Sequence, residues 1–69
     1  MDIKFNIVFK DFKEPIQSAY FDMIEETIDN YDWIIENRLR IKDIRYISIY
    51  IDNKPISISD LRIMNLLTR

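Results

Sequence analysis

Residues 44–58 read IRYISIYIDNKPISI, and the alternation in this stretch decides the fold that we expect. From Tyr46 to Ile51, isoleucine fills one set of alternate positions while tyrosine and serine fill the other, the period of two that is typical of a β-strand. The polar residues that follow favour a turn. With Asn53-Lys54 at the centre of the loop, Ile51 would lie opposite Ile56 and isoleucines would share one face. The stretch therefore predicts a β-hairpin.

The sequence before this hairpin predicts one more strand and a helix. Residues 2–10 alternate hydrophobic and mainly polar side chains, which indicates a half-buried strand. From Pro15 to about Arg38, hydrophobic residues recur every three or four positions, which predicts one continuous helix of about 24 residues. Two poor helix formers, Asp29 and Asn30, leave a break into two helices as the alternative.

After the hairpin, Ser59-Asp60 predicts the start of a short last helix, with Leu61, Met64 and Leu67 as its buried line. The order β-α-β-β-α predicts a two-layer α+β domain. Its three-stranded sheet would carry the long acidic helix and the short C-terminal helix on one face. We expect residues 1–69 to form this single domain, because so short a chain cannot build a second core.

The composition excludes several classes of site. The chain has no Cys and no His, which excludes zinc sites of the usual kind and Ser-His or Cys-His nucleophiles. It has no Gly, which excludes the usual phosphate-binding loops. No apolar run exceeds three residues, and no basic leader precedes one, so we expect no membrane span and a cytoplasmic protein. We expect no enzyme activity, no cofactor and no metal.

Charge is distributed unevenly along the chain. Residues 14–37 carry seven acidic side chains and no basic one, although the formal net charge of the whole chain is only −2. On a continuous helix most of these carboxylates would share one face, where their mutual repulsion costs roughly 1–3 kcal/mol in total. A purely structural helix would ordinarily interleave lysines. We therefore predict a partner-binding surface made of Asp22, Glu25, Glu26, Asp29, Asp32, Trp33 and Glu36.

The preferred hypothesis is a small binding or inhibitor protein whose acidic helix docks on the basic, nucleic-acid-binding surface of a partner protein. From Asp22 to Glu36 the carboxylates would span about 21 Å, roughly one charge per 4 Å, which is comparable to the phosphates of one DNA strand. A composition of fifteen isoleucines beside one alanine suggests an AT-rich coding sequence, as in low-GC bacteria, their phages or plasmids. The partner could then be a CRISPR or restriction effector, a polymerase or a nuclease in the host cytoplasm.

Alternatives remain open for the same residues. The acidic face could simply be solvated, or could hold a divalent cation weakly. Trp33 would be an exposed anchor on a continuous helix, but it would lie in the core if the helix bent at Asn30.

A second candidate surface is the face of the sheet that no helix covers, for which we predict Val8, Ile44, Tyr46 and Tyr50. This face favours a homodimer, and with it a structural or assembly module as the alternative function. Aromatic residues with flanking lysines can also stack bases and hold phosphates, so direct nucleic-acid binding is a third hypothesis. The sequence pI of about 4.9 argues against it.

Overall fold

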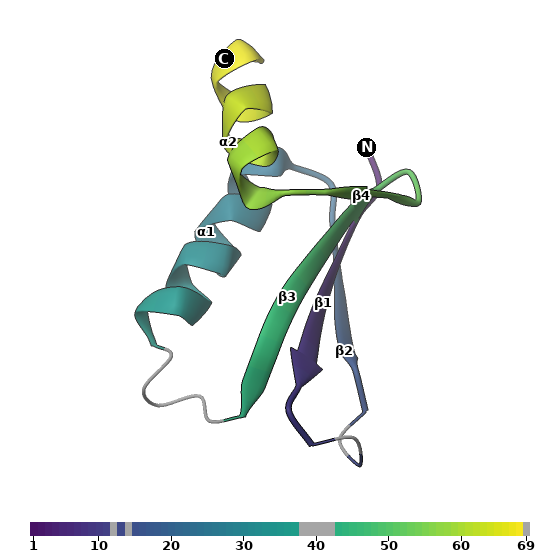
Figure 1. Ribbon diagram of the computed structural model, residues 1–69. Helices are drawn as coiled ribbons and strands as arrows, with labels where there is room; N and C mark the ends of the chain where they lie inside the picture. The colour runs from purple at the N-terminus through teal and green to yellow at the C-terminus, as the bar shows by residue number, and fades with distance from the viewer. Residues whose placement is uncertain (12, 14, 38–42, 69) are drawn as a thin grey trace.

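The computed structural model describes residues 1–11, 13, 15–37 and 43–68. The elements are β1 (Ile3–Phe9), β2 (Gln17–Phe21), α1 (Ile24–Glu36), β3 (Ile44–Ile51), β4 (Lys54–Ile56) and α2 (Ile58–Leu67). The expected α+β class and the two layers are confirmed, with both helices on one side of the sheet (Figure 1). The expected strand count is wrong, because the sheet has four strands in the order β2-β1-β3-β4, all antiparallel to their neighbours.

The extra strand, β2, comes from the segment that we expected to begin the long helix. It pairs with β1 from Ile3 opposite Phe21 to Ile7 opposite Gln17. The pairing occupies hydrogen-bonding groups along one side of β1, which a helix at this position could not do. It also places Phe21 edge-on to Phe5, with 5.8 Å between the ring centroids. These gains outweigh the helical spacing of the hydrophobic residues in this segment.

Helix α1 is therefore shorter than expected, but it is continuous through Asp29 and Asn30. The Asn30 side chain donates to the carbonyl oxygen of Glu26 at 3.0 Å, four residues back along the helix. The alternative of two helices is thus wrong. None of the described helices is long and apolar enough to cross a membrane.

The β3–β4 hairpin forms as predicted, but its turn lies one residue earlier. Asp52-Asn53 is the two-residue loop, so that Ile51 lies opposite Lys54. Both loop residues have positive φ, 49° and 68°, as a type I′ turn requires. In a chain without glycine, aspartate and asparagine are the residues that adopt this conformation at the lowest cost.

The core lies between the sheet and the two helices. Its buried hydrophobic residues are Ile3, Phe5, Ile24, Ile28, Ile34, Ile44, Ile49 and Leu61. Thr27 is also fully buried, and its hydroxyl donates to the carbonyl oxygen of Met23 at 2.9 Å. The polar group therefore enters the core with its hydrogen bond made.

The start of α2 differs from the prediction by two residues. The N-cap is Ser57, not Ser59, and its hydroxyl accepts a hydrogen bond from the backbone N–H of Asp60 at 3.1 Å. Leu61 is buried and Met64 is half-buried, as expected. Leu67, expected in the same buried line, is 80% exposed. The C-terminal end of α2 projects beyond the sheet (Figure 1), where no core is available to it.

Candidate interaction surfaces

The outer face of α1 carries most of the predicted partner-binding residues. Ile24 and Ile28 face the core, whereas Trp33, on the opposite side of the helix, is 59% exposed. Asp29 lies one turn before Trp33, and Glu36 lies one turn after it. Glu25 and Glu26, in the first turn, are also exposed, at the end where negative charge stabilises a helix. We call this set, Glu25, Glu26, Asp29, Trp33 and Glu36, the Trp33 face.

One predicted member, Asp32, is engaged by the other helix. Arg62 of α2 donates from both terminal nitrogens to the two carboxylate oxygens, with 3.2 Å between Nη1 and Oδ2. The hydrogen bonds from Arg62 lower the pKa of the Asp32 carboxyl, and the same bonds raise the pKa of Arg62. Asp32 therefore ties α1 to α2 and carries less free charge for a partner.

Another predicted member, Asp22, precedes the helix. It is exposed in the bend before Met23, the N-cap residue of α1. The helical carboxylates thus run from Glu25 to Glu36, about 16 Å along the axis instead of the 21 Å expected from a longer helix. Within the described residues, the ion pair of Arg62 with Asp32 is the single one present.

Sequence reasoning missed a groove between the two helices. It has a volume of about 300 Å³ and is lined by Glu25, Ile28, Asp29, Arg62, Asn65 and Leu66. Leu66 and its neighbour Ile63 are exposed hydrophobic residues of α2. Ile63 and Leu66 are three residues apart, so they share a side of α2 that differs from the side of Leu61 and Met64. This second apolar side was the signal in the sequence that could have indicated the groove. The groove places apolar surface directly beside two carboxylates of the Trp33 face.

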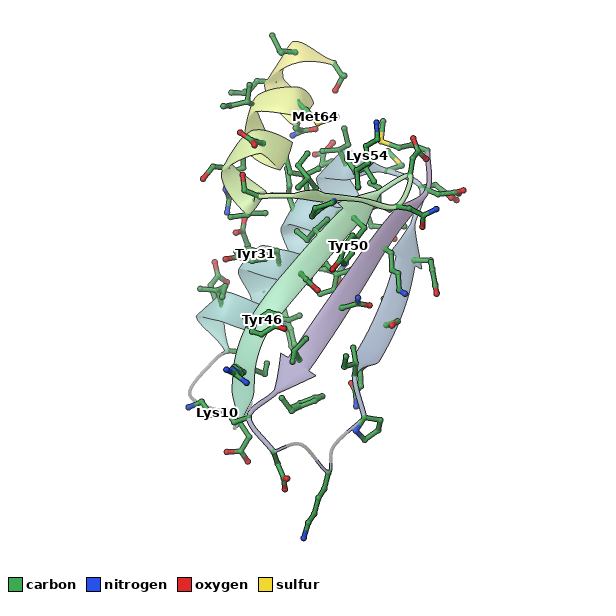
Figure 2. The ribbon with its side chains drawn as sticks, turned by 45° about the vertical axis from the view of Figure 1, so that its right-hand side comes forward. Lys10, Tyr31, Tyr46, Tyr50, Lys54 and Met64 are labelled. Carbon is green, nitrogen blue, oxygen red and sulfur yellow. The ribbon has the colours of Figure 1, made fainter. Side chains whose placement is uncertain are left out.

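The uncovered face of the sheet is the second candidate surface. Tyr46 and Tyr50 lie along β3 on this face, which is turned forward in Figure 2. In the pairing register, Lys4 of β1 lies opposite Tyr50 on one side and Tyr20 of β2 on the other. Tyr20, which the sequence analysis placed on a helix, is 73% exposed.

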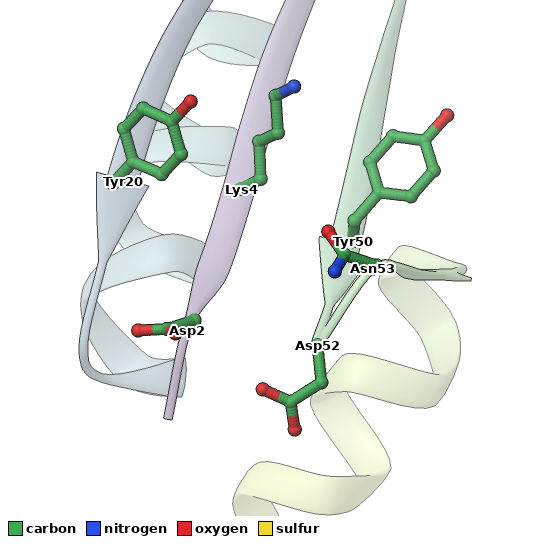
Figure 3. A pocket seen from close by; sticks show the side chains of 6 residues that line it. All are labelled: Asp2, Lys4, Tyr20, Tyr50, Asp52 and Asn53. Carbon is green, nitrogen blue, oxygen red and sulfur yellow. The ribbon is translucent and has the colours of Figure 1, made fainter.

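Tyr20, Lys4 and Tyr50 thus form a row across three strands. The row borders a hollow of about 520 Å³ at the end of the sheet where β1 begins. Figure 3 shows the side chains that line it: Asp2, Lys4, Tyr20, Tyr50, Asp52 and Asn53. The two tyrosine rings flank the lysine, while two carboxylates lie beyond it. Apart from the rings, the lining therefore combines one positive with two negative charges.

Ile44 does not belong to the uncovered face. Val8 lies opposite Tyr46, but Phe9 lies opposite Ile44, so that Arg45 is an extra residue in β3. Such a bulge reverses the alternation at this end of the strand. Ile44 is consequently 7% exposed, on the helix side. The predicted surface retains Val8, which is half-buried, together with Tyr46 and Tyr50.

In the described part of the chain, no three His, Cys, Asp or Glu side chains come together in a way that could hold a metal ion. Comparison with known proteins finds no family model, no curated protein and no solved structure that matches this chain.

Proposed function

We propose that this chain is a small, non-enzymatic binding protein that docks its Trp33 face on a basic surface of a partner protein. The observation that carries the proposal is the exposed Trp33, 59% accessible, between Asp29 and Glu36 on the outer side of α1. A large aromatic side chain that is mostly exposed adds little to the stability of the fold. At an interface it supplies the desolvated anchor that dominates binding, while the charges around it exclude water and select the partner.

The charge distribution supports a basic partner. The Trp33 face holds four carboxylates, and none of them lies within ion-pairing distance of a described cation. Such like-charge neighbours cost about 0.2–0.5 kcal/mol per pair in the free protein, and a partner rich in Lys and Arg would remove that cost. Opposite charge also accelerates association. Leu66, beside Asp29 in the interhelical groove, would add apolar contact at the edge of the same surface.

The partner that we propose is a nucleic-acid-handling protein, because its phosphate-binding surface supplies dense positive charge. Covering that surface would inhibit it. A phage- or plasmid-encoded inhibitor of a host defence protein, polymerase or nuclease is the setting in which such a small acidic protein would act.

A charge-reversal pair tests this proposal. Asp29→Lys changes the centre of the Trp33 face, whereas Asp2→Lys makes the same substitution just before β1, in the hollow that Lys4, Tyr20 and Tyr50 also line. In affinity capture from a bacterial lysate, wild type and Asp2→Lys should retain the same nucleic-acid-handling proteins, and Asp29→Lys should lose them. Duplex DNA added as competitor should release the captured proteins. Capture that is equal for both variants, or that is insensitive to DNA, would refute the proposal.

A second candidate function is the binding of single-stranded nucleic acid by the uncovered sheet face. The row Tyr20–Lys4–Tyr50 favours it, because tyrosine rings can stack bases while a lysine between them holds a phosphate. Asp2 and Asp52, which line the same hollow, oppose it. A labelled oligonucleotide at low salt distinguishes the two functions: binding that Lys4→Glu abolishes and Asp29→Lys preserves would support this second candidate.

A further inference from the structure

The two edges of the sheet are built differently. The edge strand β4 has three residues, includes Lys54 and Pro55, and leads directly into α2. Short length, lysine and proline are the features that prevent an edge strand from pairing with another chain. The opposite edge strand, β2, has five residues, QSAYF, without charge or proline. Its pairing with β1 is regular, without a bulge. Only one edge is therefore protected.

The unprotected edge is also accessible. Gln17, Ser18, Ala19 and Tyr20 are all exposed. β2 pairs with β1 on one side, and none of the described strands follows it on the other. Figure 2 shows β2 as the right-hand border of the sheet, with neither helix drawn beyond it. Backbone N–H and C=O groups along this border are therefore available to a further strand.

We propose that β2 pairs antiparallel with β2 of a second copy of this chain, which joins two four-stranded sheets into one. A two-fold axis places the same strand on both sides of the contact. Pairing of a strand with itself fails when like charges lie opposite each other, and β2 has none. A second copy of β2 therefore meets no like-charge repulsion, whereas a strongly basic or strongly acidic strand would find no opposite charge here.

The proposal fixes a register. All five residues of both strands pair only when Ala19 lies opposite Ala19 of the partner copy. Gln17 then lies opposite the partner's Phe21, and Ser18 opposite the partner's Tyr20. Alanine, the smallest side chain of the strand, would lie on the two-fold axis, where two identical side chains must fit side by side. This contact differs from a dimer through the uncovered face, because it leaves Tyr46 and Tyr50 exposed.

The absence of cysteine from the chain allows a direct test. Residues directly opposite each other in an antiparallel pair have Cα atoms about 4.5–5.5 Å apart, within the range that a disulfide requires. Ala19→Cys should therefore form a disulfide-linked dimer under mild oxidation. Ser48→Cys, on central strand β3 of the uncovered face, is the matched control and should remain monomeric on a denaturing gel. Cross-linking of Ser48→Cys without cross-linking of Ala19→Cys would show a face-to-face dimer and overturn the proposal.

Sedimentation of the wild type and of lysine variants, none of which contains cysteine, completes the test. Wild type should sediment as a dimer at micromolar concentration. Ala19→Lys, which places two ammonium groups opposite each other at the axis, should raise the dimer dissociation constant at least tenfold, while Ser48→Lys should not. A wild type that remains monomeric up to millimolar concentration would refute the proposal. Partner capture through the Trp33 face is measured separately, so either proposal can fail without the other.

Discussion

Trp33 is the only tryptophan of the chain, so that its fluorescence reports on one position. Because its side chain is mostly exposed, we expect red-shifted emission and efficient quenching by neutral acrylamide. Iodide should quench poorly, since Asp29 and Glu36 repel the anion. Added salt should narrow the difference between the quenchers, because it screens charge over about 10 Å at 0.1 M. Blue-shifted emission that resists both quenchers would contradict the exposed position.

Truncation of the same side chain separates folding from binding. Trp33→Ala should change the free energy of unfolding by less than about 1 kcal/mol, because no buried cavity is created. It should weaken binding to a captured partner by at least about 2 kcal/mol if Trp33 is the anchor. Denaturant unfolding and titration calorimetry measure the two quantities. A large loss of stability with unchanged affinity would assign Trp33 to the fold.

The Asp32–Arg62 pair predicts a pH dependence. The pKa of Asp32 is lowered in the folded protein by the hydrogen bonds from Arg62, so the stabilisation is present above the ordinary aspartate pKa of about 3.9. It is lost as the pH falls through the lowered value. The difference in unfolding free energy between wild type and Asp32→Asn should therefore be constant above about pH 5 and shrink below about pH 4. Arg62→Lys keeps the positive charge but cannot make both hydrogen bonds in the same geometry. It should therefore retain only part of the stabilisation that the Asp32–Arg62 pair provides.

At the scale of elements, local pattern was sufficient for β1, β3 and the hairpin, because alternation of hydrophobic residues is a direct consequence of strand geometry. It failed for β2. The spacing between Ile16, Tyr20 and Ile24 fits a helix, and nothing local shows that this segment has β1 as a neighbour. Pairing with β1 and the contact of Phe21 with Phe5 decide the matter, and both join residues distant in sequence.

The candidate site, too, was predictable from local pattern only in part. Exposure of the Trp33 face follows from the phase of α1 alone, so it could be predicted. The pairing of Asp32 with Arg62 could not, because thirty residues separate them. A bulge at Arg45 turned Ile44 inward, and its one trace in the sequence is a break in the alternation, because Arg45 falls in the set of positions that isoleucine fills from Ile47 to Ile51. The groove beside Leu66 exists only because α2 packs against α1.

The cap of α2 can be tested by comparing two serines. Ser57→Ala removes the acceptor for the Asp60 N–H and should cost about 1 kcal/mol of stability. Ser59→Ala, inside the first turn, should be neutral or slightly stabilising, because alanine is the better helix former. Chemical denaturation of both variants measures the difference. The reverse order would place the start of the helix at Ser59.

At the scale of the whole molecule, charge divides between the two layers. Residues 22–37, which include α1, contain six acidic side chains and no basic one. On the far side of the sheet, Asp2 and Asp52 lie near Lys4 around one hollow, so opposite charges are mixed there. The net charge of −2 therefore understates the negative potential that a positively charged surface meets when it approaches the helices.

Anion-exchange chromatography can test whether the local negative charge on α1 exceeds what the net charge predicts, with the same pair of variants. Asp29→Lys and Asp2→Lys have identical composition, mass and formal net charge, so any difference in retention comes from the position of the charge. A charged resin binds the densest patch within about a Debye length, roughly 10 Å at 0.1 M salt. Wild type should therefore elute later than its net charge predicts. Asp29→Lys, which interrupts the patch beside Glu25 and Glu26, should elute clearly earlier than Asp2→Lys. Equal retention of the two variants would mean that the helix carboxylates do not act together as one surface, and the docking proposal would lose its electrostatic basis.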